Sequence, residues 1–270
     1  MSEINLKKLI HPTCEIAIQA GKAINKYYKT KTDILLKEDK SPLTQADLIS
    51  NQVINDSLIK LNKDIPILSE ESLVDWSIRK TWETYWLVDP LDGTKEFIKE
   101  NDDFSVNIAL IENNHPVLGV IYAPTLEILY FSYKKGGSYK LNIKKLKKIE
   151  NYFDNSIKIN TTLKTKNDPL IVICSKSHPN DEFNKWITKN VKNFKLIKKG
   201  SSLKFCDIAE GTADLYPRLK PTSEWDIAAG HIILIEAGGK LESLNQKEIL
   251  YNTKESVINP YFIASCKLEL

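Results

Sequence analysis

Two aspartates separated by a proline and a leucine are the most distinctive chemical feature of the sequence. Asp89 and Asp92 follow the apolar run 85–88 and are themselves followed by Gly93–Thr94. Pro90 fixes its own φ and stiffens the turn, so the two carboxylates can converge on one side. Hard cations such as Mg²⁺ prefer oxygen ligands of this kind. The segment is a candidate metal site, although an isolated Asp–x–x–Asp–Gly turn is also common on protein surfaces.

The residues after this turn suit an anionic ligand. Gly93–Thr94 leads into Lys95–Ile98, which is predicted to form a short helix. Backbone N–H groups at the start of a helix attract phosphate. One turn can therefore offer both metal ligands and phosphate donors.

Further acidic residues stand at the ends of predicted elements. Glu70 and Glu71 follow a short apolar segment, and adjacent acids of this kind usually belong to a solvated surface. Asp47 lies three residues after Thr44, where it completes a variant of the capping box. Asp226 lies near the start of a predicted helix and can serve as its cap. Each acid has a structural interpretation beside a metal-binding one, and the residues alone leave both open.

The overall composition narrows the class of protein. The chain has 270 residues, 42% hydrophobic and 27% charged, which is typical of a soluble globular protein with a sizeable core. Its 38 basic and 35 acidic residues give a net charge of +3, which does not favour nucleic-acid binding. Four widely spaced cysteines form no CxxC pair, so neither a zinc knuckle nor a disulfide framework is indicated.

No segment has the pattern of a targeting signal or a membrane span. The first residues lack the apolar core of a signal peptide. No apolar run approaches the ~18 residues that a membrane span needs. We therefore expect a cytoplasmic protein with no transmembrane segment, and peripheral attachment to the cytoplasmic face of the inner membrane stays open.

The first half of the chain must place the acids at the ends of helices and strands. Apolar residues at helical spacing predict a helix over 5–28, with Pro12 in its early part, and a second helix that opens at Thr44. A polar loop is expected between them, over 29–43. The predicted strands are short and separated by polar turns: 65–68, 85–88, and an antiparallel meander over 106–111, 117–122 and 128–131.

The second half alternates strands with helices, which is typical of an α/β layer. Its predicted strands cover 170–174, 194–197, 213–216, 240–244 and 262–265. Its predicted helices cover 181–190, 202–210 and 227–237. The stretch 140–168 is rich in lysine and asparagine, and we place a domain boundary there. It separates an N-terminal α+β domain over 1–155, which carries the metal-site motifs, from a C-terminal α/β domain over 156–270.

Three segments match in order the signatures of the inositol monophosphatase superfamily: Leu68–Glu71, Leu87–Ile98 and Glu224–Gly230. Within it the chain resembles the CysQ-type 3′(2′),5′-bisphosphate nucleotidases. The segments that narrow the resemblance are Lys95–Ile98, Ser175–His178, Gly200–Cys206 and Leu215–Arg218. It extends from the first predicted helix to Asn259–Pro260 and is weak only over 140–168. It implies a layered αβαβα sandwich of the inositol monophosphatase and sugar phosphatase type.

The resemblance also implies roles for individual residues. The ligands of two or three Mg²⁺ ions would be Glu70, Asp89, the main-chain carbonyl of Leu91, Asp92 and Asp226. Asp47 and Thr94 would orient and deprotonate the attacking water. The N–H groups of Gly93 and Thr94 would hold the scissile phosphate. The nucleotide and its second phosphate would bind to Ser201, Lys204 and Arg218, with His178 near the nucleoside. Of the metal ligands, the substrate would also contact Glu70, Leu91, Asp92 and Asp226.

The activity implied is hydrolysis of the 3′-phosphate of adenosine 3′,5′-bisphosphate to give AMP and phosphate. The phosphosulfate analogue is a second implied substrate, the role is in sulfur metabolism, and Li⁺ is an implied inhibitor. The partner expected is therefore a small bisphosphate nucleotide and no nucleic acid, and the protein is a monomer or a homodimer.

Two other functions stay open. One is an inositol monophosphatase or another sugar-phosphate phosphatase, against which the basic residues Lys204 and Arg218 argue, because a monophosphate has no second phosphate for them. The other is a catalytically silent protein that senses phosphorylated nucleotides. The presence of all the expected carboxylates argues against that function.

Overall fold

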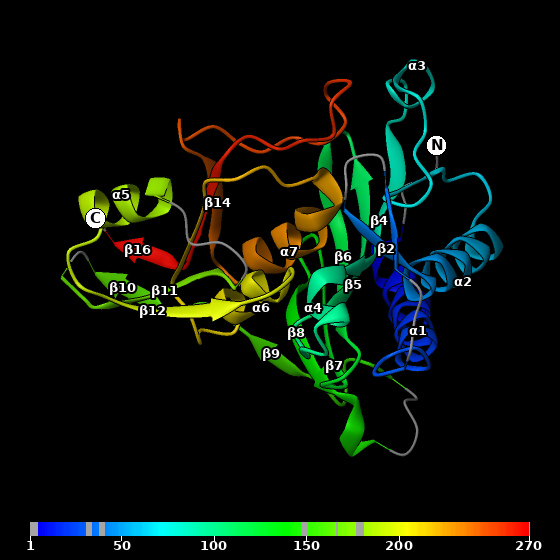
Figure 1. Cartoon of the computed structure of the whole chain (residues 1–270), viewed down its shortest axis with the longest axis horizontal. Helices are drawn as coiled ribbons and strands as arrows, with labels where there is room; N and C mark the ends of the chain where they lie inside the picture. Colours follow the sequence, from blue (N-terminus) through cyan, green and yellow to red (C-terminus); the bar gives the residue numbers. More distant parts are fainter. Residues whose placement is uncertain are drawn as a thin grey trace.

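The computed structural model describes residues 5–30, 34–37, 41–146, 151–165, 167–176 and 181–269. They form stacked layers in the order helices, sheet, helices, sheet and helix (Figure 1). The predicted layered αβαβα sandwich is thereby confirmed.

The larger sheet has seven strands in the order β3-β4-β5-β6-β7-β8-β9. β3 and β4 are parallel, and each later pair of neighbours is antiparallel. The predicted meander is confirmed as strands β5 to β7. The strands are β3 Ile67–Ser69, β4 Thr84–Asp92, β5 Ser105–Glu112, β6 His115–Ala123, β7 Ile128–Tyr133, β8 Gly137–Asn142 and β9 Ile157–Ile159.

Helices cover both faces of this sheet, which explains why its strands are nearly unbroken apolar runs. Successive side chains of a strand point to opposite faces. In β5, Ile108 and Leu110 join the core beside α1 and α2, whereas Ala109 and Ile111 join the core beside α6 and α7. The helices are α1 Leu6–Asn25, α2 Gln45–Leu61, α6 Leu203–Ala209 and α7 Glu224–Glu236.

The smaller sheet has five strands in the order β12-β11-β13-β15-β14. Its strands are β11 Leu170–Ser175, β12 Phe194–Lys199, β13 Leu215–Arg218, β14 Lys240–Ser243 and β15 Phe262–Ser265. The helix α5 (Asp181–Asn190) covers its outer face, because Phe183 and Ile187 pack against Val172 and Leu215. The predicted helix over 181–190 is confirmed.

The remaining elements are short. They are α3 Trp76–Arg79, α4 Thr94–Ile98, the 3-10 helix Ile143–Lys145, and two pairs of strands, β1 Ile34–Leu36 with β2 Pro42–Thr44 and β10 Leu163–Thr165 with β16 Lys267–Glu269. The polar loop expected over 29–43 is therefore wrong, because β1 and β2 form an antiparallel pair within it. All three side chains of β1 are exposed, so no alternation of apolar and polar residues marked this strand in the sequence.

Several predicted elements are present with different ends. β4 continues past Val88 to Asp92, because its pairing with β5 resumes at Asp92 after an irregularity. α7 begins at Glu224 rather than at Ile227, since Ser223 is its N-cap. The strand predicted over 213–216 covers 215–218 instead.

The larger sheet extends beyond the predicted domain boundary. β9 lies after residue 155 and pairs with β8. The division into 1–155 and 156–270 stays a prediction. Across the described ranges, no helix combines the length and the apolar character that a membrane crossing requires.

The contact between α7 and β6 fixes how closely the helix approaches the sheet. α7 crosses β6 at Gly119, whose missing side chain makes room for the helix. A Cβ atom at this position would lie 2.6 Å from the carbonyl oxygen of Ala229 and 2.5 Å from Cγ2 of Ile232. The backbone oxygen cannot move without shifting the helix that carries Asp226.

We expect Gly119→Ala to lower the free energy of unfolding by about 1–3 kcal/mol, the usual cost of an overpacked core. Urea unfolding followed by circular dichroism measures this change. An unchanged midpoint would contradict the close approach of α7 to β6.

Candidate active site

The turn that carries Asp89 and Asp92 is an irregularity in the pairing of β4 with β5. Asp89 is opposite Asn107 and Asp92 is opposite Ser105, and the register shifts between them. Pro90 has no N–H group for the ladder, and its carbonyl oxygen accepts a hydrogen bond of 2.7 Å from the Ser50 hydroxyl. Because the register shifts between them, the two carboxylates extend from the sheet into different surroundings.

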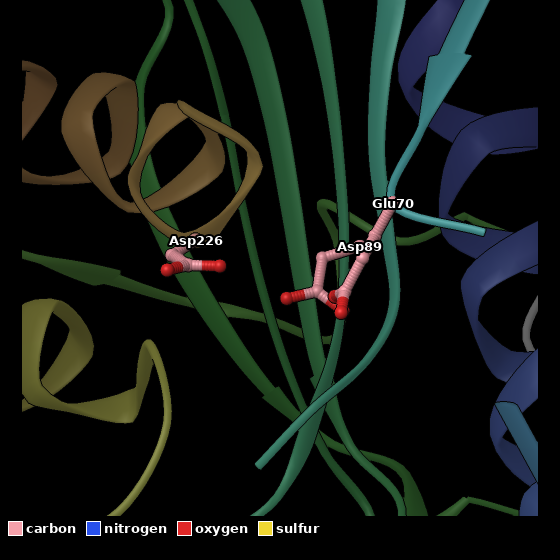
Figure 2. A group of neighbouring side chains, drawn as sticks. All are labelled: Glu70, Asp89 and Asp226. Carbon is pink, nitrogen blue, oxygen red and sulfur yellow. The ribbon is translucent and has the colours of Figure 1, made fainter. Parts of the chain in front are cut away.

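Asp89 belongs to a cluster of three carboxylates. One oxygen each from Glu70, Asp89 and Asp226 lies within 4.8 Å of the others. Glu70 follows β3, Asp89 lies in β4, and Asp226 reaches them from the first turn of α7 (Figure 2). Glu71 is not part of this cluster.

Asp226 serves both of the roles that the sequence left open, as a helix cap and as a candidate metal ligand. It is the third residue of α7, and its Oδ2 accepts a hydrogen bond of 2.9 Å from the backbone N–H of Ser223. That bond satisfies one of the unpaired donors at the helix start. The side chain thus caps the helix and also takes part in the acidic cluster.

Asp47 has a similar arrangement at the start of α2. Its Oδ2 accepts hydrogen bonds from the N–H and the hydroxyl of Thr44, at 2.7 and 2.6 Å. Its Oδ1 accepts a hydrogen bond of 3.0 Å from the Thr94 hydroxyl. The predicted capping box is confirmed, and Asp47 lies directly behind Thr94.

Burial and mutual repulsion make the cluster favour protons or cations. Burial, followed by the charges of Glu70, Asp92 and Asp226, raises the pKa of Asp89 well above its ordinary value. Burial, followed by Asp92 and Glu70, raises the pKa of Asp226 to about 8. Both shifts arise because the charged form loses its hydration and lies beside like charges.

A lysine already contacts this cluster. The Lys37 ammonium lies 2.7 Å from Oε1 of Glu70 and 2.6 Å from Oε1 of Glu71. Burial acts to lower the pKa of Lys37, but the adjacent Glu70 and Glu71 raise it above its ordinary value. The negative potential of the cluster therefore holds one cation within the protein itself.

Asp92 faces a different, basic side of the site. Its Oδ2 accepts hydrogen bonds from the backbone N–H of Ser202 and, at 3.3 Å, from the side chain of Asn107. Burial raises the pKa of Asp92, while the charges of Lys204 and Arg218 act to lower it. The irregularity in β4 thus separates an aspartate of the acidic cluster from one that faces two cations.

Lys204 is buried, with an exposed fraction of 5%. Its ammonium donates to the carbonyl oxygen of Ser201 and lies 5.3 Å from the centre of the Tyr216 ring. Burial lowers its pKa to about 8. Arg218 is anchored by hydrogen bonds of 3.2 and 2.9 Å to the carbonyl oxygens of Lys220 and Pro221.

One cavity of about 410 Å³ brings most of the predicted site residues together. The predicted residues that line it are Glu70, Asp89, Leu91, Asp92, Gly93, Thr94, Ser201, Lys204, Arg218 and Asp226. Asp47 is behind this lining, and His178 lies outside the described residues. Two lining residues have a positive φ: Gly93 (96°), which precedes α4, and Ser201 (47°), which precedes α6.

Sequence reasoning did not identify several residues that shape the cavity. Lys37 follows β1 and contacts Glu70, and no sequence motif marks this contact. Asp103 accepts a hydrogen bond of 2.9 Å from the Gly200 N–H and forms a salt bridge of 2.8 Å with Lys176. Ser202 donates to Asn107 (2.7 Å). The bonds of Gly200 and Ser202 hold the 200–202 turn beside the first half of β5. None of these long-range contacts has a signal in the local sequence.

Known proteins resemble this chain over nearly its whole length. A family model described as "Inositol monophosphatase family" matches residues 5–267. The 3′(2′),5′-bisphosphate nucleotidase CysQ of Salmonella typhimurium is 43% identical over 256 residues, which cover 94% of this chain and 98% of that protein. The protein of the same name from Escherichia coli K12 is 42% identical over 259 residues, which cover 95% and 99%.

Solved structures agree with these matches. CysQ from Bacteroides thetaiotaomicron, described as a bacterial member of the inositol monophosphatase family, superposes with a TM-score of 0.86 at 39% identity, covering 99% of this chain and 100% of that one. An inositol monophosphatase from Thermotoga maritima superposes with a TM-score of 0.72 at 22% identity, covering 94% of this chain and 90% of that one. At this identity the match supports the fold alone. The family model and the relatives together establish that the chain belongs to the inositol monophosphatase family.

Proposed function

We propose that this protein is a Mg²⁺-dependent 3′(2′),5′-bisphosphate nucleotidase that hydrolyses the 3′-phosphate of adenosine 3′,5′-bisphosphate to AMP and phosphate. The observation that carries the proposal is the division of one cavity into an acidic side, with Glu70, Asp89 and Asp226, and a basic side, with Lys204 and Arg218. The names of the CysQ relatives support the same substrate class.

The donor set of the acidic side fits a hard divalent cation. Asp89 is 1% exposed, and among the described residues its carboxylate accepts only the Leu91 N–H, at 3.1 Å. A buried carboxylate with so few partners is costly unless a cation compensates it. The proposed ligands are all oxygens, which suits Mg²⁺: Glu70, Asp89, the Leu91 carbonyl, Asp92 and Asp226.

Divalent ions bound there supply Lewis acidity, which activates water and offsets the negative charge on the departing ribose oxygen. The Thr94 hydroxyl orients the attacking water, and Asp47 accepts the proton through the hydrogen bond between them. Burial raises the pKa of Asp47 above its ordinary value, which makes it a better base than an exposed aspartate. The N–H groups of Gly93 and Thr94 hold the phosphate that is cleaved.

The basic side holds the phosphate that is kept. Arg218 can grip a phosphate with two hydrogen bonds, and Lys204 adds a point charge. Ser201 contributes its polar groups at the turn before α6, and His178 lies near the nucleoside in this proposal. A substrate with a single phosphate leaves the buried Lys204 without a new anionic partner.

Phosphate release from a panel of substrates tests the assignment. Adenosine 3′,5′-bisphosphate should turn over faster than its phosphosulfate analogue, inositol 1-phosphate and fructose 1,6-bisphosphate, and chelation of Mg²⁺ should abolish the activity. Asp89→Asn should release no phosphate and keep the circular dichroism of the parent. Faster turnover of inositol 1-phosphate than of the bisphosphate nucleotide would refute the substrate, and activity that survives chelation would refute the metal requirement.

Arg218→Ala should raise KM for adenosine 3′,5′-bisphosphate about 10- to 100-fold, because hydrogen bonds to charged groups are worth about 1.5–3 kcal/mol. Arg218→Lys should have an intermediate effect, since it keeps the charge and loses the paired hydrogen bonds. Steady-state kinetics on the nucleotide and on inositol 1-phosphate provide the comparison. An equal loss on the monophosphate would show that Arg218 does not serve a second phosphate.

The acidic cluster predicts an unusual dependence of stability on pH when metal is removed. The pKa of Asp226 is about 8 in the folded protein against an ordinary value of 3.8. A raised carboxyl pKa favours folding only while the group is protonated, so the metal-free protein loses stability as the pH rises from about 4 to about 8. Asp226→Asn lacks this loss and should be more stable than the parent at pH 8, by at least about 1.4 kcal/mol, the equivalent of one pKa unit.

Urea unfolding in the presence of a chelator, at several values of pH across this range, measures the difference. Asp56→Asn, at an exposed position on α2, is the control and should follow the parent. Addition of Mg²⁺ should reverse the order by stabilising the parent more than Asp226→Asn. A metal-free parent that is more stable than Asp226→Asn at pH 8 would argue against a strained carboxylate cluster.

A further inference from the structure

A second cavity, of about 600 Å³, lies at the opposite end of α7 from the acidic cluster. Its walls come from the start of β6, the turn between β7 and β8, the second half of α7, and β14 with the turn that follows it. Asp226 lies in the first turn of α7 and Ile235 in the last, which at 1.5 Å per residue are roughly 13 Å apart along the helix. This cavity is separate from the candidate active site and its properties do not depend on the proposed function.

A buried histidine lines this second cavity. The side chain of His231 is 6% exposed, and its Nδ1 lies 3.0 Å from the hydroxyl of the fully buried Tyr251. Among the described residues, the ring has no hydrogen-bond partner other than Tyr251, and His231 lines the cavity. Nε2 therefore has no hydrogen-bond partner among the described residues.

The histidine is neutral. Burial, followed by the charge of the nearby His115, lowers the pKa of His231 to about 3. A neutral imidazole bonded at Nδ1 presents one hydrogen-bond donor or acceptor at Nε2, according to its tautomer. A ligand that reaches this atom must offer a polar group that complements it.

Four apolar residues contribute to the walls of this cavity. Pro116, Ile232, Ile235 and Leu241 all line the cavity. Ile235 keeps 40% of its surface exposed although it lies on a helix whose other residues are mostly buried. Such walls favour a ligand with a flat apolar body, because its contact removes this surface from water.

The lining carries three lysines and three glutamates, and two of these lysines have no acidic partner among the described residues. Glu242 pairs with Lys240 at 2.8 Å, and Glu248 pairs with His115 at 3.1 Å. Glu236 accepts backbone hydrogen bonds at the turn between β7 and β8, from Lys135 (2.8 Å) and Gly137 (3.0 Å). Lys134 and Lys135 also line the cavity, and no acidic group among the described residues lies within 4 Å of either ammonium.

We propose that this cavity is a binding site for a small organic anion with a flat, apolar ring body. The ring packs on Ile232, Ile235 and Leu241, a polar atom of the ligand bonds to Nε2 of His231, and the acidic group lies toward Lys134 and Lys135. The volume is within the range of small-molecule sites.

A pair of fluorescent probes tests the site in the full-length protein. The probes are 8-anilinonaphthalene-1-sulfonate, which is anionic, and N-phenyl-1-naphthylamine, which is its uncharged counterpart. Ile235→Glu places a repelling charge on the apolar wall and should weaken binding of the sulfonate at least about tenfold. Leu250→Glu is the matched control, because Leu250 is 41% exposed and does not line the cavity, and it should leave binding unchanged.

The charge requirement is tested by the double variant Lys134→Ala with Lys135→Ala. It should weaken binding of the sulfonate at least about fivefold and leave the uncharged probe unaffected. The matched control is Lys192→Ala with Lys195→Ala, at exposed positions on and beside β12, which should change neither probe.

Nitrogen-15 NMR of the histidine rings reports on the contact with His231. Saturating sulfonate should shift the Nε2 resonance of His231 in the parent and not in Ile235→Glu. Binding that survives Ile235→Glu, equal affinity for the two probes, or an unmoved Nε2 resonance at saturation would each overturn the proposal. Phosphate release by Ile235→Glu should equal that of the parent, since this residue has no part in the active site; its loss would contradict the separation of the two cavities.

Discussion

Carboxylates that are buried together repel one another, and the group around Asp89 is the point on which the rest of the structure converges. β3, β4 and α7 each deliver one acid to the same place. Like charges held this close raise each other's pKa and oppose folding unless a proton or a cation compensates them. The scaffold therefore has to hold three separate elements rigidly against a local repulsion.

The two helical layers and the sheet between them supply that rigidity. The larger sheet is buried on both faces, so β4 cannot shift without disturbing two cores at once. Gly119 allows α7 to lie directly on β6, which fixes how far Asp226 reaches toward Asp89. The Lys37 ammonium offsets part of the charge on Glu70. The metal ions that we propose would offset the remainder, so stability and metal binding are linked through the same three side chains.

The sequence predicted the motif residues and most elements, because their signals are local. The apolar runs of β4 to β7, the helix over 181–190 and the capping box at Thr44 all follow from periodicity or from short spacing. The convergence of Glu70, Asp89 and Asp226 does not follow from such local signals, since each acid alone has an ordinary structural interpretation. Without the structure, only the family resemblance predicts that these three acids belong to one site. Lys37 and Asp103 were missed because their partners are distant in the sequence.

The alternatives that the sequence left open for Asp47 and Asp226 are compatible, and the structure explains why. Each is the third residue of a helix, and its Oδ2 accepts a hydrogen bond from the N–H of the N-cap residue. That residue is Thr44 for Asp47 and Ser223 for Asp226. In Asp47 the other oxygen turns toward Thr94, and Asp226 likewise has an oxygen left for the cluster. An asparagine in either position keeps an oxygen for the cap and loses the charge. Capping thus orients each carboxylate. The local signal that first argued against a chemical role is the means by which the fold directs Asp226 to the acidic cluster and Asp47 to Thr94.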